Sequence, residues 1–269
     1  MRWKFGPVFY RGRLDKSARL MIIGSDPGPT ECLPYVRRGF IGDSGQRVQG
    51  LLTKIGLTKS YLSMNSFAYA LFPSASNAGK GDEVNSDTEI VAWRNKVYSA
   101  AVGPNLQAIV IFGFQGKKAY ELWTGKPKVP MFYLPHPSRF DGEPDSNLLP
   151  AWKNAVTKLR TIVTPDDAAL AAKPNYGEEF TELDFSPIPR RDLPKGATIN
   201  GVFVPTPDYI GDDSWTRIVP IHNIASRPKP DNGKDLIVTS PDMTKTRIRA
   251  TPNPSGKQSD PPTFTSTPF

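Results

Sequence analysis

Cysteine and histidine are scarce in this chain: Cys32 is its only cysteine, and His136 and His222 are its only histidines. A single cysteine cannot form an intramolecular disulfide or supply the thiolates of an iron–sulfur cluster. Two histidines are too few for the usual histidine-based metal sites. We therefore expect a protein of a reducing compartment that uses no metal ion, no iron–sulfur cluster and no other cofactor.

Long hydrophobic runs are also missing. The first residues, MRWKFGPVFYRGRLDK, contain no apolar core of the kind found in signal peptides. No stretch approaches the roughly 20 apolar residues of a membrane-spanning helix. We expect a soluble, monomeric, cytoplasmic protein of bacterial type with no membrane partner.

The net charge of +8 is distributed unevenly. Residues 1–165 carry 22 Lys and Arg against 12 Asp and Glu, whereas residues 166–269 carry 12 against 14 and are rich in proline. This predicts a basic globular domain over 1–165 and a proline-rich extension over 166–269, with irregular segments or short strands and no assigned function. A basic domain commonly binds a polyanion, because Lys and Arg that contact phosphates release counterions. A solvated surface that happens to be basic would have the same composition.

Apolar runs at residues 19–24, 62–67, 108–113 and 131–134 are typical of buried parallel strands. Helical periodicity is found at 47–55, 90–102, 117–123 and 149–163, and Asp43 or Ser44 is placed to cap the first helix. Strands that alternate with helices predict a three-layer α/β/α domain with a four-stranded parallel sheet. In the extension, short strands are expected at 201–205, 215–221 and 236–239, before a low-complexity tail.

Residues capable of chemistry follow three of the predicted strands, where ligands bind in such sheets. Asp26 is the one carboxylate of the loop GSDPG after the first strand, although Asp-Pro-Gly is also good turn chemistry. Asn65 ends the second strand, and its amide presents an acceptor and two donors in one plane, which suits a base edge. His136 follows the last strand between two prolines, which hold it stiffly. Phe40 lies in GFIG before the first helix, where an ordinary core role is the alternative.

The order of these features resembles the uracil-DNA glycosylase superfamily over roughly residues 17–163. The similarity lies in GSDPG, GFIGDSGQ, YLSMNSF, Gly113 after VIF, and PHPS. It implies a monofunctional DNA glycosylase of base excision repair that flips uracil out of DNA and hydrolyses its N-glycosidic bond. Its partner would be uracil-containing DNA, which would bring it to the nucleoid.

The resemblance also implies a role for each matching residue. Asp26 would activate the attacking water, and His136 would donate a hydrogen bond to the base carbonyl as negative charge develops there. Asn65 would pair with N3–H and O4 of uracil, Phe40 would stack on the flipped base, and Ser25 would line the base pocket. Further residues would contact the DNA backbone, namely Pro27, Gly28, Gly113 and Ser138. Arg139 or Phe140, directly after PHPS, would be the wedge that fills the vacated stack.

The resemblance is mixed at the level of families. GFIGDSGQRVQGLLTKIGL is similar to the thermophilic-type enzymes with an iron–sulfur cluster, which one cysteine cannot hold. Asp26 is similar to the most active uracil-DNA glycosylases, which have at the position of Gly28 a tyrosine that blocks the thymine methyl. Without that side chain, thymine has to be excluded by another group, and Tyr35 is the nearest aromatic candidate. Two alternatives stay open: a member specialised for hypoxanthine or mismatched thymine, and a non-catalytic nucleotide- or phosphate-binding module.

Overall fold

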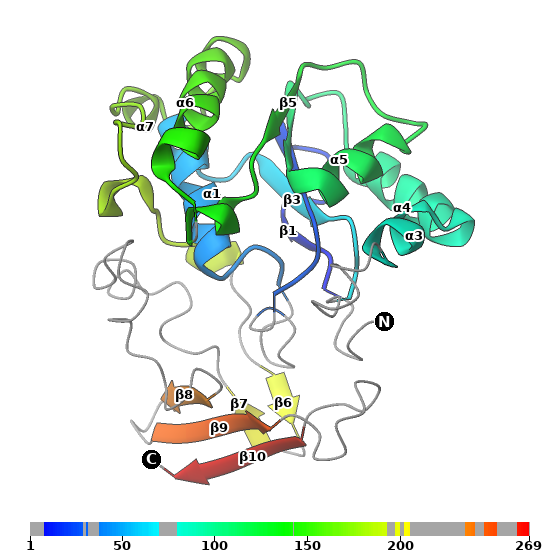
Figure 1. The fold of residues 1–269 in the computed structure, drawn as a ribbon, viewed down its shortest axis with the longest axis vertical. Helices are drawn as coiled ribbons and strands as arrows, with labels where there is room; N and C mark the ends of the chain where they lie inside the picture. The colour runs from blue at the N-terminus through cyan, green and yellow to red at the C-terminus, as the bar shows by residue number, and fades with distance from the viewer. Residues whose placement is uncertain are drawn as a thin grey trace.

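The computed structural model describes residues 8–28, 31, 38–69, 80–141 and 143–192, together with five later strands. Cys32, Tyr35 and the predicted strand at 215–221 lie outside the described residues. Figure 1 shows the described part of residues 8–192 as a sheet with helices on both faces.

The central sheet has five strands in the order β1-β3-β2-β4-β5. Their bounds are Tyr10–Gly12 for β1, Leu20–Gly24 for β2, Tyr61–Asn65 for β3, Ala108–Phe112 for β4 and Met131–Leu134 for β5. β2 to β5 are the four predicted strands and run parallel, with Gly24 opposite Asn65 and Phe112 opposite Leu134. The predicted count of four is wrong, because β1 adds a short edge strand that pairs antiparallel with β3.

Helices cover both faces of this sheet. Their bounds are Asp43–Lys54 for α1, Lys80–Ser86 for α3, Thr88–Ala101 for α4, Gly113–Glu121 for α5, Asp145–Ile162 for α6 and Ala168–Ala171 for α7. Three short 3-10 turns follow strands or helices: η1 at Pro137–Asp141, η2 at Glu182–Asp184 and η3 at Arg190–Asp192. α1 and α6 lie on one face of the sheet, and α3, α4 and α5 lie on the other (Figure 1). The predicted three-layer arrangement is confirmed.

The start of α1 differs from the prediction. The residue at its N-cap is Gly42, in an extended conformation, and no side chain caps the helix, so the proposed cap by Asp43 or Ser44 is wrong. The chain enters the helix tightly, since a Cβ at Gly45 would lie 1.8 Å from the carbonyl oxygen of Phe40. This close approach brings Phe40 directly above the first turn.

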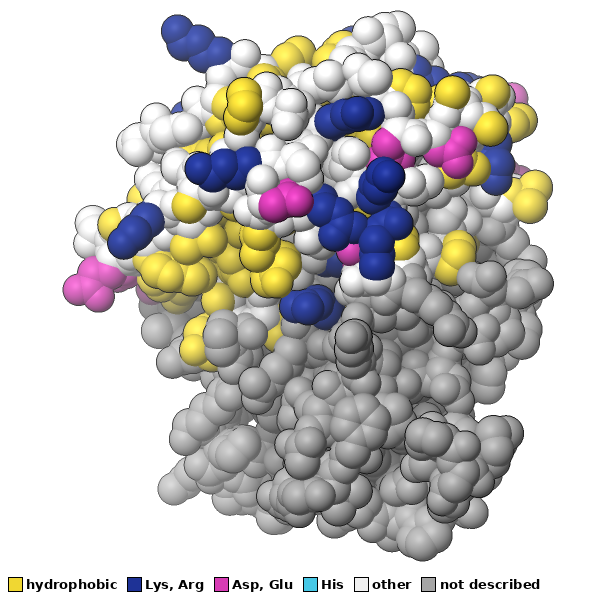
Figure 2. Space-filling view, turned by 180° about the vertical axis from the view of Figure 1, so that it is seen from behind, with side chains coloured by type: hydrophobic (Ala, Val, Ile, Leu, Met, Phe, Trp, Pro, Cys, Tyr) yellow, Lys and Arg dark blue, Asp and Glu magenta, His cyan; other side chains and the backbone are white. Residues whose placement is uncertain are grey.

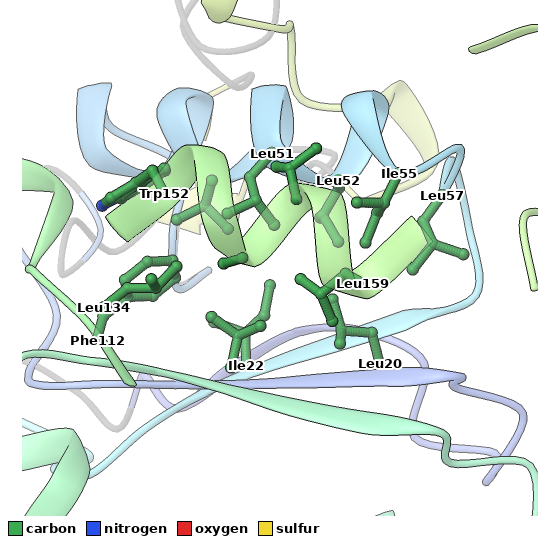
Figure 3. Packing of buried hydrophobic residues seen from close by; sticks show 14 of the residues in the cluster. Leu20, Ile22, Leu51, Leu52, Ile55, Leu57, Phe112, Leu134, Trp152 and Leu159 are labelled. Carbon is green, nitrogen blue, oxygen red and sulfur yellow. The ribbon is translucent and has the colours of Figure 1, made fainter. Parts of the chain in front are cut away.

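The larger hydrophobic core lies between the sheet and the pair α1 and α6. Figure 3 shows Leu20 and Ile22 of the sheet facing Leu52 of α1 and Leu159 of α6. Each fully buried side chain of this kind stabilises the fold by about 1.5–3 kcal/mol. Tyr176 and Phe180, from the segment after residue 165, are buried in the same core. The segment that contains these two residues is therefore packed against the α/β domain.

The outer edges of the sheet are short. β1 has three residues, and β5 has four residues between Pro130 and Pro135. On β5, Met131 and Tyr133 are exposed, and the ammonium of Lys117 lies 5.5 Å from the centre of the Tyr133 ring.

Two small antiparallel sheets occur in the extension. β6 (Ala197–Ile199) pairs with β7 (Val202–Val204), and β9 (Lys245–Thr251) lies between β8 (Asp235–Thr239) and β10 (Thr263–Pro268). β7 and β8 confirm two of the predicted short strands, whereas β10 lies in the stretch predicted to be a low-complexity tail. No helix in the described part of the chain combines the length and apolar character that crossing a membrane requires.

Candidate active site

The site is built where β2, β3, β4 and β5 end, because the carboxyl ends of parallel strands meet at one edge of a sheet. The structure groups the predicted residues into two sides. On one side, the loop after β2, Phe40 and Asn65 come together, and on the other side Gly113 lies against His136. Ser66 links the two sides, because its hydroxyl lies 2.5 Å from the carbonyl oxygen of Gly24 and 3.2 Å from that of Gln115 in α5.

Phe40 and Asn65 meet over Gly24. A Cβ at Gly24 would lie 2.4 Å from Cζ of Phe40 and 3.1 Å from Oδ1 of Asn65. Phe40 is 5% exposed and has a positive φ of 59°, a strained conformation for an aromatic residue that is typical of functional sites. Its turn is fixed because the N–H of Gly39 donates to the carbonyl oxygen of Tyr10 in β1. The glycine at position 24 thus permits a close contact that any side chain would prevent.

The amide of Asn65 is buried, with an unused donor. The side chain is 2% exposed, and its Nδ2 has no hydrogen-bond partner among the described residues. The backbone is held on both sides, since its N–H donates to the carbonyl oxygen of Phe9 and its carbonyl accepts from the Tyr98 hydroxyl. A buried donor without a partner costs about 1–3 kcal/mol, and this one belongs to an amide that meets the Phe40 ring over Gly24.

The loop that carries Asp26 is tied to β3. The N–H groups of Ser66 and Phe67 both donate to the carbonyl oxygen of Ser25, at 2.8 and 3.1 Å. The Ser25 hydroxyl donates to Oδ1 of Asp26 at 2.8 Å, which orients a half-buried carboxylate at the mouth of the site. Pro27 is buried, and among the described residues nothing lies within 4 Å of the place of a Cβ at Gly28.

Glu31 is a functional candidate that sequence reasoning missed. Its Oε2 accepts the N–H of Gly28 at 3.0 Å, and its Oε1 accepts the N–H of Ile41 at 2.8 Å. Burial raises the pKa of this carboxyl to about 7, although both hydrogen bonds and the Arg11 charge oppose the rise. Glu31 therefore joins the Asp26 loop to the turn that carries Phe40. The available signal was the single acid between the two glycine-containing motifs.

His136 is held as a neutral imidazole. Its Nδ1 lies 2.8 Å from the Ser138 hydroxyl and accepts the N–H of Ser138 at 3.3 Å, so the ring proton is assigned to Nε2. Burial, and next the positive charge of Arg47, lower the pKa of His136 to about 4. Gly113 has a φ of +70°, and a Cβ there would lie 3.3 Å from Cβ of His136. The ring can therefore donate a hydrogen bond through Nε2 at neutral pH.

The two wedge candidates are placed differently. Phe140 is 5% exposed and packs against Trp152 and Phe180, with ring centroids 5.3 and 4.7 Å apart, so it cannot enter DNA without leaving the core. Arg139 is exposed and forms an ion pair with Glu143. Phe114, which sequence reasoning missed, is 61% exposed directly after Gly113.

The surface has a basic character. Figure 2 shows Lys and Arg side chains spread across one face of the described part, several of them close together, with fewer Asp and Glu. Among the residues that the structure describes, no group of three or more His, Cys, Asp or Glu side chains is arranged to hold a metal ion.

The residues of the candidate site lie in the part of the chain that matches a known protein family. The family model of the uracil DNA glycosylase superfamily matches residues 11–160, which is more than half of the chain. A comparison with curated protein sequences finds no match. The matched range ends before Tyr176 and Phe180, the aromatic residues that complete the larger core.

Proposed function

Because the chain belongs to the uracil-DNA glycosylase superfamily, we propose that it is a monofunctional DNA glycosylase that hydrolyses the N-glycosidic bond of uracil in DNA. The observation that carries this proposal is the buried Asn65 amide, whose Nδ2 has no partner among the described residues and which lies beside the Phe40 ring. A planar amide next to an aromatic face suits a flipped base, which needs both edge pairing and stacking.

Asn65 would select uracil by the direction of its hydrogen bonds. Oδ1 would accept N3–H of the base, and Nδ2 would donate to O4. Cytosine has an acceptor at N3 and an amino group at position 4, so both contacts would become mismatched. Leaving buried polar groups unpaired in this way can reject a ligand by about 10⁴ or more.

His136 would stabilise the departing base. Negative charge develops on the base carbonyl as the bond to the sugar breaks, and the Nε2–H of a neutral imidazole can donate to that oxygen. The low pKa of about 4, caused by burial and Arg47, keeps the ring neutral at physiological pH. Uncharged His136 therefore suits an oxyanion-stabilising role.

Asp26 would act on the sugar side of the bond. Its carboxylate, oriented by the Ser25 hydroxyl, would position and deprotonate the attacking water and steady the positive charge that develops on the sugar. The proton of the water would pass to the carboxylate as oxygen bonds to the anomeric carbon. The mechanism needs no cofactor.

Other residues would hold the DNA. Four further residues follow strand ends at the same sheet edge: Pro27 and Gly28 after β2, Gly113 at the start of α5, and Ser138 in η1. There they would contact phosphates or sugars flanking the flipped nucleotide. Exposed Arg139 is the better placed of the two wedge candidates, because Phe140 is buried. We propose that the protein acts as a monomer on DNA in the cytoplasm.

A broader base preference is the second candidate, and Gly28 favours it. Among the described residues nothing occupies the space in front of Gly28, the position at which the most active uracil-DNA glycosylases have a tyrosine that blocks the thymine methyl. Tyr35, the proposed alternative guard against thymine, lies outside the described residues. Under this candidate, excision would extend to thymine in T·G mismatches or to hypoxanthine.

The test is a panel of oligonucleotides that contain uracil, cytosine, hypoxanthine or a T·G mismatch, incubated in EDTA and then cleaved with alkali at abasic sites. We expect uracil release by the natural protein, and a fall in uracil release with a gain of cytosine release in Asn65→Asp. The matched control is Asn105→Asp, which makes the same change at an exposed position. Release of another base alone would favour the second candidate. DNA binding without any release would favour a non-catalytic module.

A further inference from the structure

We propose that Arg47 is a positioning residue for His136, held in place by aromatic side chains that come partly from residues 176–185, beyond the range matched by the family model. The inference rests on the proposed function for its catalytic meaning. The geometric argument does not depend on that function, because it rests on contacts between α1, η1 and the segment that follows α6.

Arg47 reaches the histidine turn directly from α1. Its side chain is fully buried, and its Nη1 donates to the carbonyl oxygen of Pro137 at 3.0 Å. This carbonyl belongs to the residue that follows His136, and the next turn is closed by the N–H of Arg139 donating to the His136 carbonyl. A fixed Arg47 therefore fixes the backbone on which the His136 ring is mounted.

Three aromatic rings surround the guanidinium. Its central carbon lies 5.9 Å from the centroid of Phe140, 5.9 Å from that of Phe180 and 5.3 Å from that of Phe185. Attraction between a cation and an aromatic face becomes stronger when water is excluded, as it is around a fully buried arginine. Two of the three rings come from the segment after residue 165.

This segment is clamped across α1 on both sides of Arg47. The N–H of Ser186 donates to the carbonyl oxygen of Gln46, and the ammonium of Lys54 lies 2.7 Å from Oδ1 of Asp184. Between them, a Cβ at Gly50 would lie 1.8 Å from the carbonyl oxygen of Asp184, so the close crossing requires glycine.

The Phe180 end is anchored to α6. The N–H of Phe180 donates to Oδ2 of Asp145 at 2.7 Å, and its ring stacks on the buried Tyr176. Phe180 is therefore placed by contacts that do not involve Arg47. The aromatic enclosure is part of the folded core, and Arg47 fits into it.

Arg47 also sets the charge around His136. Gly113, Pro137 and Ser138, which surround the ring from α5 and η1, carry no charge. Arg139 of η1 is paired with Glu143, which lies two residues beyond this turn, and Asp141 ends the turn, five residues after His136. The positive charge of Arg47 opposes protonation of His136, so it favours the neutral donor that the proposed reaction uses.

The test compares Arg47→Met, Arg47→Lys and Phe185→Leu with the natural protein. Tyr120→Leu is the matched control, because its ring faces Lys126 on the other side of the sheet. One measurement is the titration of His136 by proton NMR in DNA-free protein, with the two histidine signals assigned from a His222→Gln variant. The other is the single-turnover rate of uracil release as a function of pH, with the Kd for DNA measured alongside.

In Arg47→Met we expect His136 to titrate at higher pH and the release rate at neutral pH to fall about 10- to 100-fold, with DNA affinity nearly unchanged. Arg47→Lys keeps the positive charge but lacks the planar guanidinium. We therefore expect its His136 pKa to be close to the natural value, while its release rate stays below the natural rate. Phe185→Leu should show a smaller rise of the His136 pKa and a smaller fall of the release rate. If Arg47→Met does not fold, this variant tests the proposal in its place. The proposal is overturned if the folded variants keep the natural His136 titration and release rate. If no protein releases uracil, the proposed function fails, while the NMR titration still decides the role of Arg47.

Discussion

Each side of the site is braced by a buried ionisable side chain, an acid on one side and a base on the other. On the side of Asp26, the Glu31 carboxylate accepts the N–H groups of Gly28 and Ile41. On the side of His136, the Arg47 guanidinium donates to the carbonyl oxygen of Pro137. In each case the side chain complements the backbone groups that it meets, with acceptor oxygens for two N–H groups and a donor for a carbonyl oxygen. A buried ionisable side chain thus holds the backbone of a loop on each side of the candidate site.

The two braces differ in how far they reach along the chain. Glu31 joins segments that lie within residues 28–41, close together in sequence. Arg47 depends on Phe140, and on Phe180 and Phe185 from beyond the matched family range. The contacts of Glu31 are therefore local, whereas those of Arg47 require the chain to return after α6.

The largest effects are expected when each side loses its reacting group. Asp26→Asn should lower single-turnover uracil release by about 10²–10⁴, the usual contribution of a general base. His136→Asn should lower it by about 10²–10³, the usual cost of one oxyanion donor. DNA affinity, measured by fluorescence anisotropy, should change little in both, and Glu121→Gln serves as an exposed control. Near-natural release by Asp26→Asn would remove that carboxylate from the mechanism.

Among the described residues nothing occupies the space in front of Gly28, so we expect thymine to be excluded incompletely. We expect slow but measurable thymine release from a T·G duplex by the natural protein, because Gly28 presents no side chain. Gly28→Tyr should lower thymine release by about 10–200-fold relative to uracil, the range that one methyl group is worth in a pocket. Single-turnover release from T·G and U·G duplexes, measured side by side, checks this. An unchanged ratio would show that the C5 position of the base lies elsewhere.

Burial should give the two sides opposite responses to acid, because it disfavours the charged form of an acid, Glu31, on one side and of a base, His136, on the other. The folded-state pKa of Glu31 is raised from 4.5 to about 7, so its contribution to stability is present below pH 4.5 and is lost as the pH rises through 7. The folded-state pKa of His136 is lowered from 6.5 to about 4, so its contribution is present above pH 6.5 and is lost as the pH falls through 4.

Urea unfolding of the natural protein, Glu31→Gln and His136→Asn across this pH range separates the two effects. Between pH 4.5 and 6.5, the free energy of unfolding should rise with pH more steeply in Glu31→Gln than in the natural protein, by a few kcal/mol at most over the range. In His136→Asn the slope should change in the opposite direction. Parallel curves for all three proteins would contradict the assigned burial of both groups.

The smallest effect is expected from removing the chain after Asp192. A protein that ends there keeps Phe180 and Phe185, so both braces remain intact. Its DNA affinity should stay within a few-fold of the natural value and should still fall steeply with salt, because the excess positive charge lies in residues 1–165. Anisotropy titrations at several salt concentrations measure this. A protein that folds but no longer binds DNA would place the later strands in the DNA interface.

The sequence predicted the elements whose own residues determine them. β2 to β5 are apolar runs, and α1, α4, α5 and α6 follow the predicted periodic segments. β1 was not predicted because its three residues, YRG, contain no apolar run and are paired only by β3, some fifty residues away. α3, with the sequence KGDEVNS, lacks apolar periodicity and is placed by its contacts with α4 and α5.

The residues of the candidate site likewise differ in whether the sequence alone could identify them. Asn65 and His136 could be identified because each follows a strand, and strand ends are predictable. Glu31 and Arg47 could not, because charged residues are normally exposed and the partners that bury them are distant or lie in loops. Phe140 closely follows the PHPS motif and was therefore predicted as a possible wedge. The contact of its ring with Phe180, forty residues later, holds Phe140 in the core instead.

β5 forms an edge of the central sheet, and this edge bears on whether copies of the protein associate at high concentration. An exposed sheet edge can recruit a strand from another molecule and start aggregation. Here the edge is four residues long and is bounded by Pro130 and Pro135, which have no N–H to offer a neighbour. Lys117 beside Tyr133 adds a charge that an incoming strand would have to bury. We therefore expect two copies of this chain not to pair their sheets at this edge, even at high concentration.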